Sequence, residues 1–124
     1  PEALKVVGKY RQRLLNGEIT VWDLIVTKHL SKDPKRYRQR VSQVIAAEQL
    51  IREGADVPAG KNVRFLFTSA ENKRYERRVL AEELIEASTN SDIKKYLSFL
   101  YSAAASLLGS LGYKVEDIRN AVKT

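Results

Sequence analysis

The sequence predicts an α+β fold that is mostly helical, with about four helices around a small antiparallel sheet. Apolar residues recur at helical spacing in several segments, and the longest such segment is Ile93–Leu108. Val63, Phe65 and Phe67, in contrast, alternate with other residues, as in a strand with one buried side. A chain of 124 residues fits one domain with a modest core, so residues 1–124 are expected to form a single domain.

The first helix is expected over residues 2–15, and Asn16-Gly17 provides its stop. A short turn at 18–23 carries Trp22, which we expect in the core because a lone tryptophan beside a strand is usually buried. A half-buried strand follows from Leu24 to about Lys28. The apolar face of the first helix consists of Leu4, Val7, Leu14 and Leu15.

The second helix is expected to start at Asp33-Pro34, because aspartate caps free N–H groups and proline suits the first helical position. It is expected to run to Glu53, with a kink near Arg40, and to end at Gly54. Its predicted buried stripe comprises Val41, Val44, Ile45, Ala47, Leu50 and Ile51.

A hairpin is expected in the second half of the chain. A turn at 57–60 leads into the strand 63–68, and Val79–Ala81 returns antiparallel to it after the polar connection 70–78. The remaining predicted elements are the helix 93–108, a stop at 109–112 and a polar last turn or short helix at 113–122.

The net charge of +7 and the isoelectric point near 9.7 indicate a polyanionic partner, most often a nucleic acid. The alternative is that the charge serves solubility alone. The positive excess is concentrated in residues 28–40, which favours a binding surface.

Catalysis, cofactors and membranes have little support. The chain has no cysteine and only one histidine, His29, so thiolate chemistry and histidine-based metal sites or triads lack their residues. The acidic pairs Glu82-Glu83 and Glu116-Asp117 are adjacent, so their side chains diverge. No glycine-rich phosphate loop, signal peptide or membrane-length apolar stretch occurs. We therefore expect no catalytic residue, metal, cofactor, small-molecule substrate or membrane contact, and a cytoplasmic location.

The candidate site is a run of cations that begins on the first strand and continues towards the second helix. Phosphate contacts need several Lys or Arg side chains along a path, and Asp33 is the one local counter-charge here. Backbone N–H groups near Asp33–Arg36 are expected to add phosphate contacts at a helix start. The predicted DNA-binding residues are Thr27, Lys28, Lys32, Lys35, Arg36, Arg38 and Arg40.

Three other features have two interpretations each. His29 is either a hydrogen-bonded residue at a strand end, which is favoured, or a DNA contact. Tyr37 either stacks on a base or leans on the core. A second basic patch is partly offset by acids and is favoured as an ordinary solvated face. This second patch consists of Lys73, Arg74, Arg77 and Arg78. No pattern reads base edges, so recognition of backbone and shape is expected.

The order of these motifs resembles the C-terminal thumb subdomain of family B DNA polymerases of the archaeal and eukaryotic replicative type. A strand with Thr-Lys-x-Leu is followed by a basic segment, an amphipathic helix ending in glycine, an aromatic strand, Glu-Glu after a third strand, a long helix and Leu-Gly-Tyr. The matching stretches are Leu24–Leu30, Ala46–Gly54, Pro58–Phe67, Leu80–Leu84 and Ser110–Tyr113.

The resemblance implies a fragment of a larger polymerase that grips primer-template duplex DNA through the sugar-phosphate backbone. Lys28 would contact the primer-strand backbone, Thr27 would support it, and the following cations would extend the grip. The palm and fingers of the parent would be its protein partners, and the palm would hold the catalytic aspartates. The fragment alone would therefore be inactive. A first residue that is Pro1, with no methionine in the chain, fits an excised piece. The composition suits a heat-adapted archaeal source, with a nucleoid-associated location.

Two other functions stay open. One is a standalone basic nucleic-acid-binding protein, directed to RNA or architectural. The other is a protein-interaction module, such as a polymerase accessory subunit, whose surface would be the small-residue face at Ala103–Ala105.

Overall fold

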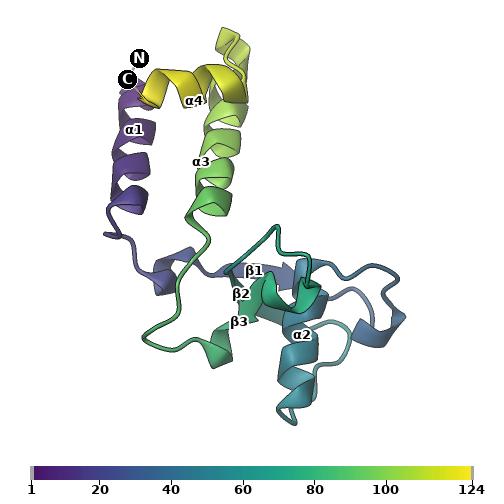
Figure 1. The fold of residues 1–124 in the computed structure, drawn as a ribbon. Helices are drawn as coiled ribbons and strands as arrows, with labels where there is room; N and C mark the ends of the chain where they lie inside the picture. Colours follow the sequence, from purple (N-terminus) through teal and green to yellow (C-terminus); the bar gives the residue numbers. More distant parts are fainter. Residues whose placement is uncertain (1, 124) are drawn as a thin grey trace. The chain divides into compact units, whose positions relative to one another are not determined.

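The computed structural model describes residues 2–123 and confirms the α+β class. The described chain contains four α-helices, which are longer in sum than the strands of its three-stranded antiparallel sheet (Figure 1). The helices are α1 (Glu2–Leu15), α2 (Ser42–Arg52), α3 (Ile93–Leu108) and α4 (Val115–Lys123), and the strands are β1 (Val26–His29), β2 (Asn62–Phe67) and β3 (Val79–Ala81). No helix among residues 2–123 is long and apolar enough to cross a membrane.

The chain forms two compact units. Residues up to 20 and from 93 onwards make the helical unit, and residues 21–92 make the sheet unit. In the helical unit α1 packs against α3, and α4 packs against both (Figure 1). The core of this unit consists of Val7, Tyr101, Ala104, Leu108 and Ile118.

The small side chain of Ala104 lies inside this core, with 5% of its surface exposed. The expected close packing at the alanine run is therefore confirmed, and its partners are Val7 of α1 and Ile118 of α4. The proposal that Ala103–Ala105 forms a free docking surface is wrong for the buried Ala104, because the chain's own helices cover it. The predicted stop at 109–112 is confirmed: α3 ends at Leu108, and the 3₁₀ turn Gly109–Leu111 that follows ends at Gly112, whose φ of 86° suits glycine.

In the sheet unit β2 lies between β1 and β3, and α2 packs against β2 and β3. Val26 faces Phe65 across one pair and Phe65 faces Ala81 across the other, so the three share one face. The predicted hairpin of 63–68 with Val79–Ala81 is confirmed. Leu66, on the opposite face, is also fully buried, so β2 is covered on both sides at this point and not on one side alone as predicted.

The side-chain amide of Gln49 closes the outer edge of the sheet. Its Nε2 donates to the carbonyl of Val79 at 2.8 Å, and its Oε1 accepts from the N–H of Ala81 at 2.8 Å. A third contact joins Nε2 to the carbonyl of Glu76 at 3.3 Å. The amide of α2 thus takes the place of a fourth strand for the carbonyl of Val79 and the N–H of Ala81.

The predicted helix from Asp33-Pro34 to Glu53 is wrong in its first part. Only Pro34–Arg36 forms a 3₁₀ turn, Tyr37 is extended, and α2 begins at Ser42. The segment 35–40 offers almost no apolar surface to bury on a helical face. A helix would also place Lys35 near Arg38 and Arg36 near Arg40, and such like-charge pairs are unfavourable.

Three burial predictions also fail. Leu15, predicted on the apolar face of the first helix, is 46% exposed at the end of α1. Trp22 is 56% exposed. It belongs to the 3₁₀ turn Val21–Leu24, and because residues three apart in such a turn lie on one side, Val21 and Leu24 share a side from which Trp22 faces away. The strand therefore starts at Val26, later than predicted. In α2 the stripe includes Ala46 and Gln49, whereas Ile51 at its end is 38% exposed.

The single-domain prediction has a direct test. Trp22 is the chain's one tryptophan and lies in the sheet unit, whereas three of the four α-helices lie in the helical unit. If the units fold as one domain, tryptophan fluorescence and far-ultraviolet circular dichroism should give the same midpoint in a urea titration. Separate midpoints would contradict a single cooperative domain.

Replacing Gln49 by leucine should destabilise the sheet unit by about 2–4 kcal/mol, because the buried carbonyl of Val79 and N–H of Ala81 lose their partners. Urea unfolding followed by fluorescence measures the change. The matched control is Gln39→Leu, which removes an exposed glutamine of the same unit and should shift the free energy of unfolding by less than about 0.5 kcal/mol. Equal shifts for the two variants would contradict the role given to Gln49.

Candidate nucleic-acid interface

Thr27 and Lys28 lie on β1, and both are exposed. Thr27 is opposite Arg64 and Lys28 is opposite Val63 on β2, so the two side chains point to opposite faces of the sheet. The sequence placed them together on one path. The structure separates them by face, and Lys28 lies at the rim of the face that carries the buried Val63.

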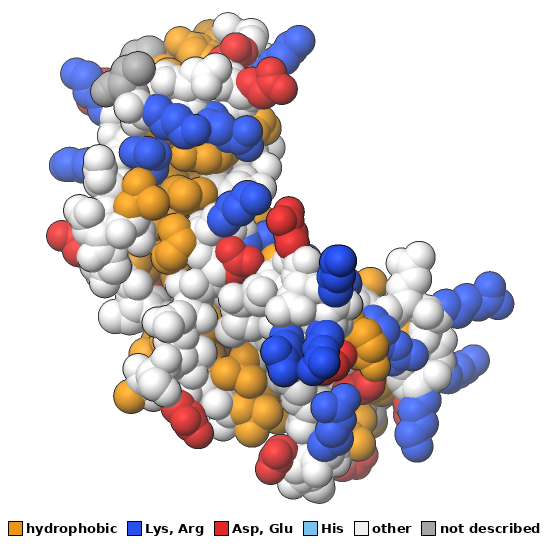
Figure 2. Space-filling view, in the orientation of Figure 1, with side chains coloured by type: hydrophobic (Ala, Val, Ile, Leu, Met, Phe, Trp, Pro, Cys, Tyr) orange, Lys and Arg blue, Asp and Glu red, His pale blue; other side chains and the backbone are white. Residues whose placement is uncertain are grey.

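The connection between β1 and α2 carries four further predicted residues that are all exposed. On the face shown in Figure 2, Lys and Arg side chains stand out from the edge of the sheet unit where this connection runs. Within residues 2–123, neither these four side chains nor Lys28 form an ion pair. The four residues are Lys32, Lys35, Arg36 and Arg38. We call these four together with Lys28 the free cations.

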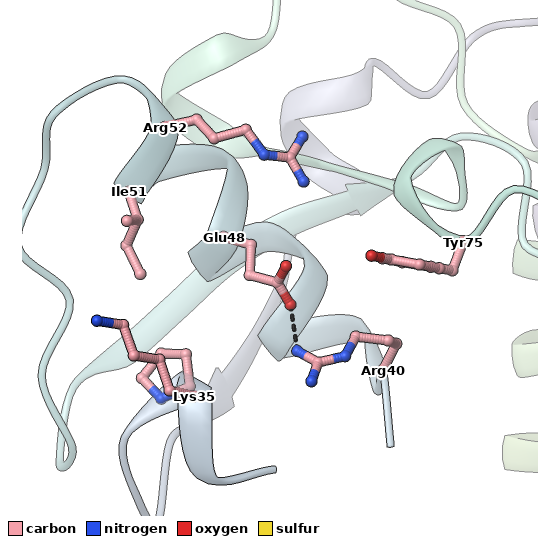
Figure 3. Close-up of a pocket in the computed structure, with 7 residues that line it drawn as sticks. Lys35, Arg40, Glu48, Ile51, Arg52 and Tyr75 are labelled. Carbon is pink, nitrogen blue, oxygen red and sulfur yellow. Dashed lines mark hydrogen bonds and ion pairs between the residues drawn. The ribbon is translucent and has the colours of Figure 1, made fainter. Parts of the chain in front are cut away.

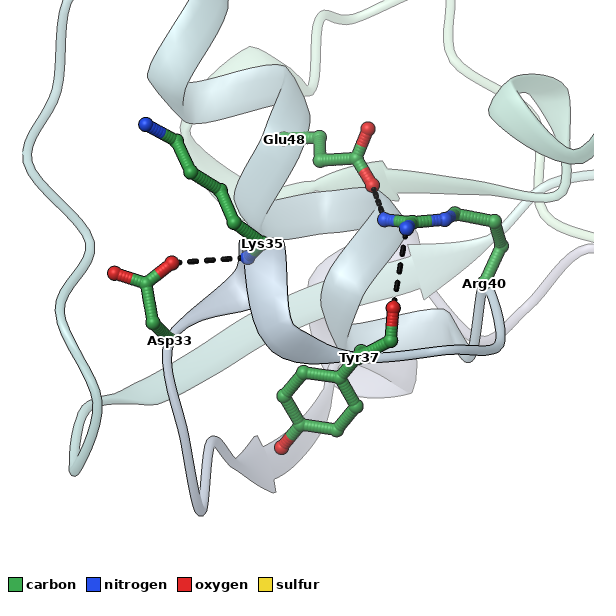
Figure 4. A network of polar contacts seen from close by, with 5 residues as sticks. All are labelled: Asp33, Lys35, Tyr37, Arg40 and Glu48. Carbon is green, nitrogen blue, oxygen red and sulfur yellow. Dashed lines mark hydrogen bonds and ion pairs between the residues drawn. The ribbon is translucent and has the colours of Figure 1, made fainter.

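Arg40 has a different environment. Its guanidinium forms an ion pair with Glu48 of α2, and its Nη2 donates to the carbonyl of Tyr37 at 3.2 Å (Figure 4). The side chain is 34% exposed. Arg40 therefore fastens the connection to α2, and its charge is balanced locally.

Asp33 organises the start of the 3₁₀ turn. Its Oδ1 accepts from the N–H of Lys35 at 2.9 Å (Figure 4), and its carbonyl accepts from the N–H of Arg36 at 2.9 Å. Asp33 thus caps the turn as predicted. The expected backbone phosphate site at Asp33–Arg36 is wrong, because Pro34 has no N–H and the next two donors are occupied. A turn of three residues also has little dipole.

Tyr37 is half-buried, and the contacts of its side chain are with the turn that precedes it. Its hydroxyl accepts from the N–H of Ser31 at 3.0 Å and lies 3.2 Å from Ser31 Oγ. Lys32 Nζ lies 5.0 Å from the centre of the ring, a cation–π contact. The hydrogen bond from the Ser31 side chain, with smaller contributions from backbone hydrogen bonds and from Lys32, lowers the pKa of Tyr37 below its usual value. Tyr37 closes the turn that carries Lys32.

The open face of the sheet carries a row of polar side chains. Arg64 forms an ion pair with Glu82, and its Nη1 lies 3.5 Å from Thr27 Oγ1. His29 Nδ1 lies 3.1 Å from Asn62 Oδ1 on the neighbouring strand, so the favoured interpretation as a hydrogen-bonded strand-end residue is confirmed. Sequence reasoning missed Arg64, since cross-strand register joins positions far apart in the chain.

The second basic patch is partly internal. Arg78 is half-buried and its Nε donates to the carbonyl of Asn72 at 2.8 Å, whereas Lys73, Arg74 and Arg77 are exposed. Among the described residues, no group of three or more histidine, aspartate or glutamate side chains is placed to hold a metal ion.

The lowered pKa of Tyr37 can be measured by ultraviolet titration of the phenolate. The part of the titration that disappears in Tyr37→Phe should have its midpoint below 10.0, and Ser31→Ala should move that midpoint back towards 10.0. Because the folded pKa is below the unfolded one, the contribution of Tyr37 to stability is present above the unfolded value and is lost as the pH falls through the folded value. An unchanged midpoint in Ser31→Ala would contradict this cause.

The sequence and the fold match known polymerases. The model of DNA polymerase family B matches residues 2–111. A DNA polymerase of Pyrococcus horikoshii is 24% identical over 119 residues, which are 95% of this chain and 10% of that protein. A DNA polymerase of Methanocaldococcus jannaschii is 30% identical over 83 residues, or 67% of this chain and 5% of that protein.

A solved structure is also similar. It is titled as the family B DNA polymerase from the hyperthermophilic archaeon Pyrobaculum calidifontis, and it matches with a TM-score of 0.74 and 27% sequence identity. The match covers 89% of this chain and 14% of that one. This chain therefore corresponds to a small part of the length of each relative. Since the family model covers most of the residues, the chain belongs to DNA polymerase family B.

Proposed function

We propose that this chain is the thumb of a family B DNA polymerase and that it grips primer-template duplex DNA through the sugar-phosphate backbone. The observation that carries the proposal is the set of free cations, which are exposed and have no ion pair within residues 2–123. Each of them can neutralise a phosphate without first breaking an ion pair. The archaeal relatives support the family context of this role.

The free cations are held on a fixed support. The Arg40–Glu48 ion pair joins the end of the connection to α2, and the Tyr37–Ser31 hydrogen bonds close its beginning. Lys35 and Arg36 lie on the capped turn between these two points. A path of cations with little freedom loses less entropy on binding than a disordered tail would lose.

The proposal assigns separate roles to Lys28 and Thr27. Lys28 contacts the primer-strand backbone, and the free cations after it extend the grip along the duplex. Thr27 supports the site through the Arg64 guanidinium rather than by direct contact with Lys28. The parent's palm and fingers supply the chemistry, so this chain contributes binding and processivity in a nucleoid-associated location.

Lys28→Ala should weaken binding to a primer-template duplex about threefold to tenfold at low salt and reduce the slope of log K against log salt by about 0.9, because one phosphate contact is lost. The melting temperature should change little, since Lys28 is exposed and forms no ion pair within residues 2–123. Fluorescence anisotropy across a salt series measures both quantities. Lys73→Ala, the same substitution at an exposed residue of the second patch, is the control and should leave both nearly unchanged.

The same titrations separate the alternatives. A clear preference for duplex RNA over duplex DNA would favour a standalone RNA-binding protein. An absence of nucleic-acid binding at low salt would favour a protein-interaction module. A second experiment adds the chain to a polymerase core that lacks its own thumb. Among the three alternatives, only a thumb is expected to restore processive synthesis.

A further inference from the structure

A pocket of about 520 Å³ lies beside the free cations, in the sheet unit. Three elements form it: the 3₁₀ turn Pro34–Arg36, the outer side of α2, and a second turn, Tyr75–Arg77. Figure 3 shows the Glu48 carboxylate between Lys35 on one side and the Tyr75 ring on the other, with Arg52 extending above it in this view. The lining residues are Pro34, Lys35, Arg40, Glu48, Ile51, Arg52 and Tyr75.

The pocket carries a positive surplus. Lys35, Arg40 and Arg52 contribute three positive charges against the one negative charge of Glu48, and Glu48 is paired with Arg40. Neither the Lys35 ammonium nor the Arg52 guanidinium has an ion pair within residues 2–123. An anionic group beside these two side chains would therefore find its counter-charge already exposed.

The rest of the lining is apolar or aromatic. Tyr75 is 36% exposed and Ile51 is 38% exposed, so both offer surface that is accessible inside the pocket. Pro34, on the 3₁₀ turn, is a buried part of the lining. The pocket thus combines an aromatic ring, an aliphatic side chain and two unpaired cations, which suits a ligand with one flat apolar part and one anionic part.

We infer that this pocket binds an unpaired nucleotide of single-stranded nucleic acid, with its phosphate near Lys35 and Arg52 and its base against Tyr75. A base stacks on an aromatic side chain when its face is free, whereas a duplex presents mainly phosphates and groove edges. The volume is in the range of pockets for small ligands. Glu48 has acceptor capacity beyond the Arg40 contact, so it can accept a hydrogen bond from a base amino group. The inference rests on the proposed function, because Lys35 also belongs to the duplex grip.

The test measures binding of the 124-residue chain to a labelled single-stranded oligonucleotide of about eight nucleotides and to a DNA duplex, both by fluorescence anisotropy. Tyr75→Leu should lower affinity for the single strand about fivefold or more, because it removes the stacking surface and keeps an apolar side chain. Arg52→Gln should lower the same affinity and reduce its salt slope by about 0.7. Both variants should leave duplex affinity within about twofold.

The matched control is Arg77→Gln, which removes one charge from an exposed residue of the same turn as Tyr75 but outside the pocket. It should keep the affinity of the unsubstituted chain for the single strand. Ultraviolet cross-linking of an iodouracil-substituted oligonucleotide, followed by peptide mapping, should place the attachment at Tyr75. Circular dichroism of each variant checks that it is folded.

Several results would overturn the inference. These are equal losses for Arg52→Gln and Arg77→Gln, equal losses for single strand and duplex, and no loss for Tyr75→Leu in a folded protein. Occupation of the pocket by an acidic aromatic peptide, with no oligonucleotide binding, would do so as well. Unchanged duplex affinity in Lys28→Ala would contradict the proposed duplex grip. The inference about the pocket would still hold if Tyr75→Leu lowered the affinity for the single-stranded oligonucleotide.

Discussion

The two hydrogen bonds between the Gln49 amide and the edge of β3 fix the face of the molecule on which the candidate site lies. They hold α2 at one rotation and one height against the sheet, because both atoms of the amide are used and the groups that they meet are on a strand. Glu48 precedes Gln49 in the helix and therefore points away from the sheet, towards Arg40. Through this ion pair the position of α2 sets the end of the connection that carries the free cations. Ile51 and Arg52 follow Gln49 within one helical turn. The contact of Gln49 with β3 therefore also fixes their place in the wall of the pocket.

The repulsion among the cations has a structural consequence of its own. A continuous helix through 34–53 would have stacked like charges on successive turns, and the structure instead interrupts the helix between Arg36 and Ser42. As a result the cations lie on a 3₁₀ turn and an irregular connection and not on the faces of one helix. The structural roles at its two ends fall to Tyr37, by hydrogen bonding, and to Arg40, by pairing.

Local patterns were sufficient for much of the fold. Alternation at Val63, Phe65 and Phe67 indicated β2, and Gly54 ends α2 with a φ of 93°, as a residue without a side chain allows. The helix predicted to start at Asp33-Pro34 fails for a local reason, the like charges and missing apolar surface of 35–40. Other failures come from interactions between distant positions. Trp22 had no local signal against burial. The β3 residues that bond to the Gln49 amide lie 30 and 32 residues further along the chain. The exposure of Lys28, Lys32, Lys35, Arg36 and Arg38 could be predicted from their type. Their relation to Glu48, Arg52 and Tyr75 could not, because it depends on how α2 is rotated against the sheet.

The positive charge of the sheet unit is distributed unevenly along its sequence. Residues 28–40 contain six Lys and Arg against Asp33 alone, a surplus of five, whereas the rest of residues 21–92 contain seven basic and ten acidic residues. The positive charge of this unit is therefore concentrated on one segment of the chain, and acidic residues outnumber basic ones in the remainder of the unit. The helical unit has nine basic and four acidic residues without such a concentrated run. A uniform excess of the same size would favour solubility and non-specific attraction. Segregation of charge within the sheet unit instead places the positive surplus on the connection that carries most of the free cations and borders the pocket.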